Sequence, residues 1–192
     1  GGIGGKPIDL VCVNLYPFEQ TVARGASHDE TIENIDIGGP SMVRSAAKNQ
    51  ARVTVVTEPG DYDEVLRAVK SGDGPNASLR ARLAAKAFTQ TAAYDGAISA
   101  YLTSQGSDSK FPGALTLSFT KAYDVRYGEN PHQQGAFYIE RNAPAGSLAL
   151  AESLGAGGKE LSFNNLLDLD HAHKVLDDDH YNLEKAKERI RE

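Results

Sequence analysis

The sequence predicts an α/β protein whose first part holds a parallel sheet and is followed by a second, shorter unit. Three observations lead to this prediction. Short apolar runs alternate with capped helical segments in the first third of the chain. Residues 105–113 are rich in Gly, Ser, Asp and Pro, a composition typical of a linker. Beyond that linker, two further strand-like runs and a helical segment indicate the second unit.

The elements of the first unit follow from the order of strand and helix signals. Residues 8–13 and 52–57 predict buried strands, because each run is short, continuous and rich in β-branched residues. The spacing from Ser27 to Glu30 is that of a capping box, which predicts a helix running toward Asn34. Strand, helix and strand in this order favour parallel pairing. Three more helices are expected: 41–49, entered through 38–40; one capped by 61–64 and ending near Gly72; and 79–102.

The longest of these helices has an apolar stripe, which is interpreted as a face toward the core. Its members are Leu83, Ala87, Phe88, Thr91, Ile98, Tyr101 and Leu102. In the second unit, strands are expected at 115–119 and 135–139, with a helix at 166–176. Residues 181–192 form a charged helix candidate with oppositely charged pairs three residues apart.

Composition and charge narrow the class of protein. The 192 residues carry 20 Lys and Arg against 26 Asp and Glu, a net charge of −6. This balance argues against a general nucleic-acid coat protein, so nucleic acid is not expected as a partner. No apolar run approaches the roughly 20 residues needed to span a bilayer, and no membrane association is expected. The single cysteine, Cys12, forms no internal disulfide, which favours the cytoplasm, and is expected to be a buried small hydrophobe.

A first polar cluster, residues 14–18, comes directly after the first predicted strand. In open parallel sheets, ligands bind beyond the carboxyl ends of the strands, so Asn14 and Tyr16 can face a pocket. The amide of Asn14 offers a donor and an acceptor, and Pro17 restricts Tyr16 to extended geometry. A structural turn with a packed tyrosine explains the same residues equally well.

A second cluster, residues 34–41, contains Asp36 followed by Gly38 and Gly39. Two glycines before a helix let backbone N–H groups approach a ligand, and a helix N-terminus favours negative charge. On the same helix Arg44 and Lys48 are four residues apart and so share a face. A plain loop is the simpler interpretation of the glycines.

A third cluster, residues 126–133, packs a guanidinium, a phenol, a carboxylate, amides and an imidazole into eight positions. This density fits recognition of a small molecule that carries phosphate and amide groups, with Arg126 as the phosphate ligand. His132 taken alone is more often structural than catalytic. Downstream, Asn164 and Asn165 either extend that site or cap a helix.

A metal site is not expected. His171 and His173 are two residues apart and do not share a helix face, and the acidic run at 177–179 reads as solvent-exposed.

Together, these strings resemble the bifunctional purine biosynthesis enzymes that join an IMP cyclohydrolase to a phosphoribosylaminoimidazolecarboxamide (AICAR) formyltransferase. Five ordered blocks carry the resemblance and spread over about residues 8–168. They are residues 14–18 (NLYPF), 35–39 (IDIGG), 44–49 (RSAAKN), 85–95 (AKAF to YD) and 126–133 (RYGENPHQ).

The resemblance implies an incomplete methylglyoxal-synthase-like domain at 1–119 and the beginning of a cytidine-deaminase-like transformylase domain at 120–192. It implies formyl transfer from 10-formyltetrahydrofolate, a cosubstrate, to AICAR, followed by dehydrative closure of formyl-AICAR to IMP. The cyclohydrolase of this family uses no metal or organic cofactor. Its members form homodimers, so a homodimer is expected.

The resemblance also assigns residues. Tyr16, Asp36 and Lys48 match acid/base or polarising positions of the cyclohydrolase and are expected to converge on one cavity beside the strand ends. Contacts to substrate are implied for Asn14, Gly38 and Gly39 in that site, and for Arg126, Tyr127 and Asn165 in the transformylase site.

Two departures from the family pattern matter. A segment with phosphate-gripping and catalytic residues would precede residue 1, and the transformylase's Lys-His pair would follow residue 192. The region after Asp177 does not match the family pattern. The chain is therefore expected to be a fragment or a set of joined pieces, and a non-catalytic nucleotide-binding module is the alternative function.

Overall fold

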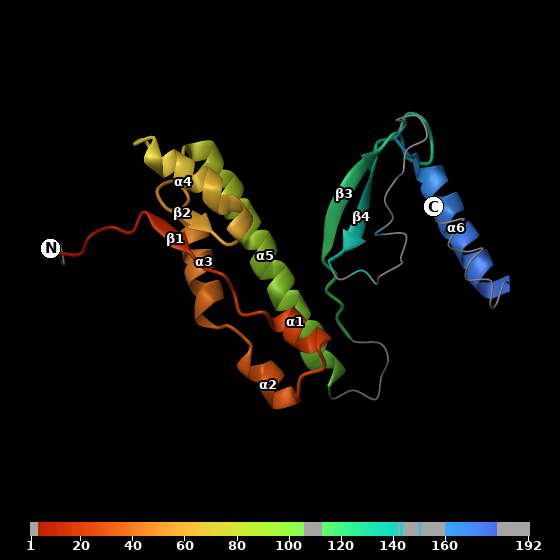
Figure 1. Ribbon diagram of the computed structural model, residues 1–192, viewed down its shortest axis with the longest axis horizontal. Helices are drawn as coiled ribbons and strands as arrows, with labels where there is room; N and C mark the ends of the chain where they lie inside the picture. Colours follow the sequence, from red (N-terminus) through yellow and green to blue (C-terminus); the bar gives the residue numbers. More distant parts are fainter. Residues whose placement is uncertain (1–3, 106–112, 142, 144–149, 151–159, 180–192) are drawn as a thin grey trace. The chain divides into compact units, whose positions relative to one another are not determined.

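The computed structural model describes residues 4–105, 113–141, 143, 150 and 160–179, with side chains described through residue 172. The chain divides into two compact units, Gly1–Leu117 and Ser118–Glu192, which are treated separately below (Figure 1). The division falls two residues before the domain boundary expected from sequence. Residues 106–112 of the expected linker and the helix candidate at 181–192 lie outside the described residues.

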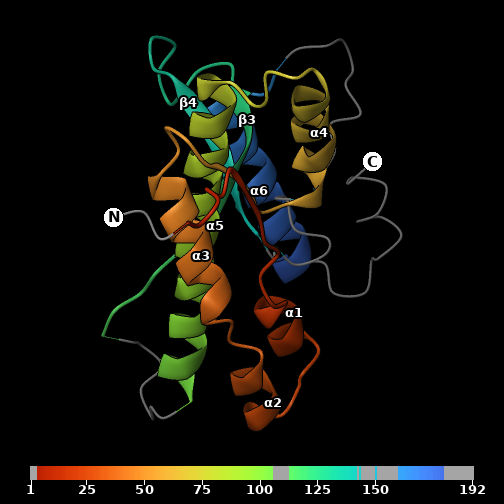
Figure 2. The same ribbon diagram turned by 90° about the vertical axis from the view of Figure 1, so that its left-hand side faces the viewer.

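The first unit is built on a parallel pair of strands, as predicted. β1 (Leu10–Cys12) pairs with β2 (Thr54–Val56) in the register Leu10 to Thr54 and Cys12 to Val56. Its helices are α1 (Phe18–Ala23), α2 (His28–Glu33), α3 (Gly38–Lys48), the 3-10 turn η1 (Pro59–Asp61), α4 (Tyr62–Lys70) and α5 (Ala77–Ser104). α3 runs beside α5 in both Figure 1 and Figure 2.

The core surrounds β2, which is buried along its whole length. Apolar side chains from β2 and from three helices close over one another there, while Val11 and Val13 are only partly buried against them. The core members are Val43, Ala46 and Ala47 of α3, Val53, Val55 and Val56 at β2, Val65 of α4, and Leu83, Ala84 and Ala87 of α5.

The expectation of a buried first strand is wrong. Ile8 is 67% exposed and Leu10 47%, and Cys12 is an exposed free thiol instead of a buried hydrophobe. Among the described residues β1 pairs with β2 alone, so only the side chains facing the core are covered. A β-branched run fixes the strand but not how many neighbours cover it.

Of the two helix caps predicted from sequence, one is formed by its side chain and the other is not. Ser27 caps α2, its hydroxyl accepting a hydrogen bond from the Glu30 N–H at 3.2 Å, which confirms the predicted helix start, while the Glu30 carboxylate pairs with Arg24. Asp61 precedes α4 without capping it through its side chain. Its carboxylate instead accepts a hydrogen bond from the Lys86 ammonium at 2.7 Å and ties η1 to α5. The stripe on α5 is core-facing at Leu83, Ala87 and Thr91, while Phe88 and Leu102 are exposed.

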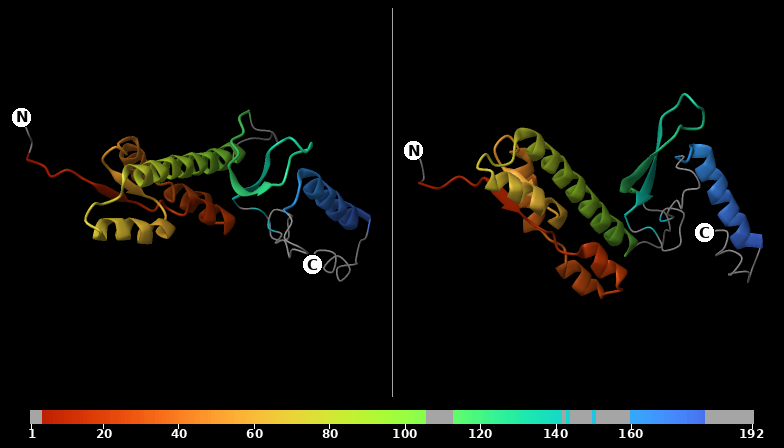
Figure 3. Two further views of the ribbon diagram at one scale, coloured as in Figure 1. Left: turned by 90° about the horizontal axis from the view of Figure 1, so that it is seen from above. Right: turned by 45° about the horizontal axis from the view of Figure 1, so that its top comes forward.

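The second unit is a hairpin with a helix. β3 (Phe119–Val125) pairs antiparallel with β4 (Gly135–Glu140), and the register shifts between Lys121 and Tyr123. The strand expected at 115–119 is therefore wrong except at Phe119, whereas the strand at 135–139 is confirmed. α6 (Phe163–Asp179) contains the predicted helix and begins three residues earlier (Figure 3).

None of the helices described is both long and apolar enough to cross a bilayer.

Candidate functional site

The carboxyl end of β1 and the start of α3 bring Tyr16 and Asp36 together. One carboxylate oxygen of Asp36, Oδ1, accepts a hydrogen bond from the Gly39 N–H at 2.7 Å. The other, Oδ2, accepts from the Tyr16 N–H at 3.4 Å. Tyr16 is 56% exposed and Asp36 is half-buried, and the contact between them is made by the Tyr16 backbone N–H.

Glycine at position 39 is what allows this approach. An ideal Cβ on Gly39 would lie 2.5 Å from Oδ2 of Asp36 and 2.8 Å from Cδ2 of Leu15. Gly38 has open space at the same position. The two glycines thus differ: Gly39 makes room for the Asp36 carboxylate, while Gly38 leaves the first turn of α3 uncovered.

Asn14 is fixed from two sides at the same edge of the sheet. Its Nδ2 donates to the carbonyl oxygen of Thr57 at 3.2 Å, and its Oδ1 accepts from the Tyr62 hydroxyl at 2.7 Å. The pKa of Tyr62 is raised, chiefly by its hydrogen bond with the Cys12 side chain and then by burial. Sequence reasoning missed Tyr62, which was read only as part of a helix-capping string; its place shortly after the second strand was the available signal.

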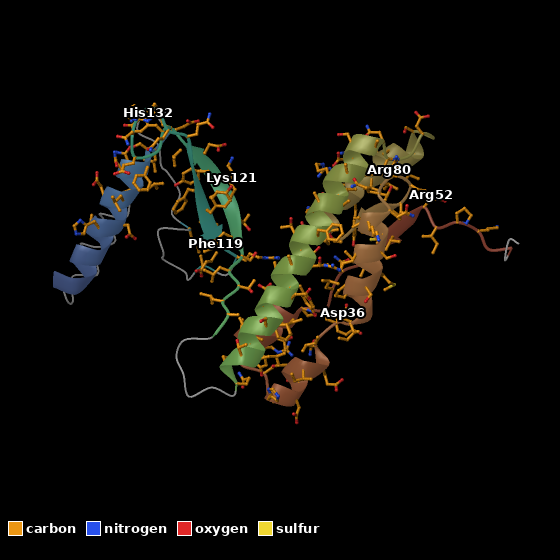
Figure 4. The ribbon with its side chains drawn as sticks, turned by 180° about the vertical axis from the view of Figure 1, so that it is seen from behind. Asp36, Arg52, Arg80, Phe119, Lys121 and His132 are labelled. Atoms are coloured by element: carbon orange, nitrogen blue, oxygen red, sulfur yellow. The ribbon has the colours of Figure 1, made fainter. Side chains whose placement is uncertain are left out.

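Lys48 lies apart from this pair. Asp36 precedes α3 and Lys48 ends it, and the ten steps from Gly38 to Lys48 give an axial separation of about 15 Å at 1.5 Å per residue. Figure 4 shows Asp36 at one end of this helix and Arg52, just beyond Lys48, near the other. The structure thus brings together two of the three residues expected to converge, and the roles of all three stay predictions.

Arg44, expected to share a face with Lys48, stacks its guanidinium on the Phe88 ring at 5.5 Å. This contact joins α3 to α5 near the middle of both helices.

In the second unit, Arg126 and Tyr127 contact each other at the end of β3. The guanidinium lies 4.8 Å from the ring centroid of Tyr127, and its Nη2 donates to the phenol oxygen at 3.1 Å. The hydrogen bond from Arg126 lowers the pKa of Tyr127, with a smaller contribution in the same direction from Ser162. Arg126 is exposed and Tyr127 is half-buried, and a guanidinium is a group that binds anions.

Asn165 takes part in the cap of α6. Its Oδ1 accepts from the Ser162 N–H at 3.0 Å and from the Ser162 hydroxyl at 2.9 Å, while the Asn165 N–H donates back to that hydroxyl at 3.3 Å. The capping alternative is therefore confirmed for Asn165, and the signal Ser162-to-Asn165 was present in the sequence. Asn164 instead donates from Nδ2 to the Glu129 carbonyl at 3.4 Å.

A cleft of about 640 Å³ opens beside this cap. A guanidinium, two carboxylates and an amide line it together with apolar side chains. Its lining residues are Arg126, Glu160, Leu161, Asn165, Asp168, Leu169 and Ala172. Two backbone bonds hold its wall in place, from the Arg126 N–H to Leu161 O at 2.9 Å and from the Phe163 N–H to Tyr127 O at 3.1 Å.

The turn between β3 and β4 is ordered by its own polar groups. The Gly128 N–H donates to Gln133 O at 2.9 Å, and the Asn130 N–H donates to Gln133 Oε1 at 2.8 Å. Figure 4 shows His132 at this turn and Phe119 at the opposite end of the hairpin. Much of the polar cluster predicted from the sequence thus stabilises the turn, and Arg126 is its member that lines the described cleft.

The described side chains include no group of three or more His, Cys, Asp or Glu arranged to hold a metal ion. The side chains of His173, His180 and residues 177–179 lie outside those described.

Known proteins are similar to this chain over most of its length. The sequence profile of the AICARFT/IMPCHase bienzyme family matches residues 46–187. The bifunctional purine biosynthesis protein PurH of Sorangium cellulosum is 61% identical over 183 residues, covering 91% of this chain and 35% of that protein. PurH of Myxococcus xanthus is 55% identical over 174 residues, covering 90% of this chain and 33% of that protein.

Among solved structures, one titled "Crystal structure of ForH" is 36% identical and covers 52% of this chain and 53% of its own, with a TM-score of 0.43. The chain spans about a third of the length of the two PurH relatives. The family profile covers well over half of the chain, and the relatives match it almost throughout. The chain belongs to the AICARFT/IMPCHase bienzyme family.

Proposed function

We propose that this chain takes part in the last two steps of IMP biosynthesis: formyl transfer from 10-formyltetrahydrofolate to AICAR, then dehydrative ring closure of formyl-AICAR to IMP. The first unit is proposed as part of a methylglyoxal-synthase-like cyclohydrolase domain. The second is proposed as the start of a cytidine-deaminase-like transformylase domain. We further propose a cytoplasmic homodimer whose partners are small purine precursors.

The observation that carries the cyclohydrolase proposal is the Asp36 carboxylate held between the Tyr16 backbone N–H and the first turn of α3, in a chain of this family. In ring closure the carboxamide nitrogen bonds to the formyl carbon, and the formyl oxygen leaves as water. The nitrogen must lose protons and the oxygen must gain them, so a carboxylate and a phenol on two residues in contact are suited to the two transfers. Asn14, Gly38 and Gly39 would hold the base and so keep the two arms of the substrate in a reactive orientation.

A test of this proposal measures IMP formation from formyl-AICAR by ultraviolet absorbance. Asp36→Asn keeps the size of the side chain and removes its charge, and turnover is expected to fall about a hundredfold or more, the range typical of a lost general base. Asp124→Asn, which removes the same charge from an exposed side chain of the second unit, is the matched control. No turnover by the parent chain, or equal turnover in the parent and Asp36→Asn, would contradict the proposal.

One observation favours the non-catalytic alternative, namely the position of Lys48 at the far end of α3. If Lys48 acts in ring closure, Lys48→Ala lowers turnover with little loss of folding, because this exposed side chain contributes little packing. If the chain only binds nucleotide, calorimetry detects IMP binding without turnover, and Lys48→Ala changes neither.

The transformylase proposal is supported by the cleft beside α6. Arg126 at its rim suits a phosphate, and Tyr127 and Asn165 offer hydrogen bonds to the rest of AICAR. Arg126→Ala is expected to weaken AICAR binding measured by calorimetry while cyclisation is unchanged. Equal loss of both would indicate a folding defect and leave the assignment without support.

A further inference from the structure

The structure contains a buried hydroxyl that contacts the backbone of the loop just before the proposed catalytic carboxylate. Tyr94 of α5 is 6% exposed. Its hydroxyl accepts a hydrogen bond from the Asp36 N–H at 2.8 Å and donates to the Asn34 carbonyl at 3.2 Å. One side-chain oxygen therefore bridges Asn34 and Asp36, two residues apart in the loop between α2 and α3.

The ring of Tyr94 is itself held in place. Phe18 of α1 packs against it edge-on, with ring centroids 6.1 Å apart and planes at 68°. Burial raises the pKa of Tyr94, so the hydroxyl keeps its proton, and its donor role toward Asn34, well beyond neutral pH. A buried phenol with both of its hydrogen-bonding functions used is a rigid anchor.

The anchor acts on a carboxylate with little freedom. Oδ1 and Oδ2 of Asp36 accept from the N–H groups of Gly39 and Tyr16, one on α3 and the other after β1. Neither of these donors fixes the backbone of Asp36 itself. In the described structure the bond to the Asp36 N–H comes from α5, a helix that otherwise takes no part in the proposed site.

We propose that Tyr94 is a positioning residue: its hydroxyl fixes the 34–36 loop and so holds the Asp36 carboxylate in the geometry needed for ring closure. The catalytic part of this inference rests on the proposed cyclohydrolase function. The geometric part does not, because the hydrogen bonds of Asp36 are measurable without turnover.

The test compares Tyr94→Phe with Tyr101→Phe in the 192-residue chain. Tyr101 lies on the same helix, packs on the same Phe18 at 5.8 Å and hydrogen-bonds His28 through its hydroxyl at 3.1 Å. Each variant thus removes one hydroxyl from the same aromatic cluster, but only Tyr94 touches the Asp36 loop.

Amide hydrogen exchange at Gly39 and Tyr16 is the first readout, because those N–H groups report where the carboxylate is. In Tyr94→Phe, their exchange is expected to be about tenfold or more faster than in Tyr101→Phe, after correction by the amides of β2 for global opening. Equal exchange at Gly39 in the two variants overturns the inference, since the carboxylate would then hold its place unaided.

Steady-state closure of formyl-AICAR is the second readout. For Tyr94→Phe, kcat is expected to fall about ten- to a hundredfold with KM nearly unchanged, as a misplaced catalytic group predicts. Tyr101→Phe is expected to keep the parental kcat. An unchanged kcat beside faster Gly39 exchange overturns the catalytic part. An inactive parent chain overturns the proposed function, and the exchange comparison still decides whether Tyr94 positions Asp36.

Discussion

Adding one methyl group at Gly39 should disrupt the candidate site, whereas the same change at Gly38 should not. A Cβ on Gly39 would lie 2.5 Å from the Asp36 carboxylate and 2.8 Å from Leu15, while the space at Gly38 is open. Overpacking of this kind costs about 1–3 kcal/mol. If Asp36 instead swings away, the loss of its bond to the Gly39 N–H costs about 1 kcal/mol, as for a helix cap.

Gly38→Ala is the matched control, because alanine lowers the entropy of the unfolded chain and is expected to stabilise by about 0.4–1 kcal/mol. The entropic gain is common to both glycine-to-alanine changes, so the two variants should differ in free energy of unfolding by the packing cost alone, about 1–3 kcal/mol, or several °C in Tm. Urea and thermal unfolding followed by circular dichroism measure the difference. Equal stability of the two variants would refute the argument that the Asp36 carboxylate is packed against Gly39.

Three further predictions concern charge and capping. Hydrogen bonds with Asp61 and then Glu58 raise the pKa of Lys86 above its ordinary value of 10.5. The stability that Lys86 contributes is therefore present below pH 10.5 and is lost as the pH rises through the folded-state pKa. In urea unfolding, the difference in stability between the parent and Lys86→Met should narrow over that range. Arg126→Gln should raise the pKa of Tyr127 toward its ordinary value, seen as a shift of tyrosinate absorbance to higher pH, and an unchanged titration would contradict the contact. Ser162→Ala removes the cap of α6 and should cost about 1 kcal/mol, measured as faster amide exchange in its first turn, with no change there disproving the cap.

Local chemistry made much of the fold predictable. The helix start at Ser27 and the alternation of strand and helix signals depend on neighbours a few residues away, and the structure confirms both. The exposure of β1 was not predictable from local sequence, because residues Leu10 to Cys12 do not indicate how many strands pair with them. The start of β3 at Phe119 was missed because the apolar run at 115–118 has the same composition as a strand.

The candidate site was predictable in its polar members but not in its supports. Tyr16, Asp36 and Gly39 stood out because they follow strand and precede helix signals. Tyr94 did not, because the sequence of a helix does not predict which groups the hydroxyl of a core-facing tyrosine will hydrogen-bond. The distance between Asp36 and Lys48 follows from helical rise alone, so their separation was calculable from the predicted helix.

The exposed thiol of Cys12 gives this protein a practical advantage. It is the one cysteine of the chain, and its side chain contacts Tyr62, which in turn hydrogen-bonds Asn14. A maleimide dye or spin label would therefore attach at a single known atom beside the strand end, and no other cysteine would have to be replaced first. Its emission or relaxation, followed in equilibrium and stopped-flow titrations, would test the proposal that a nucleotide binds beside Asn14.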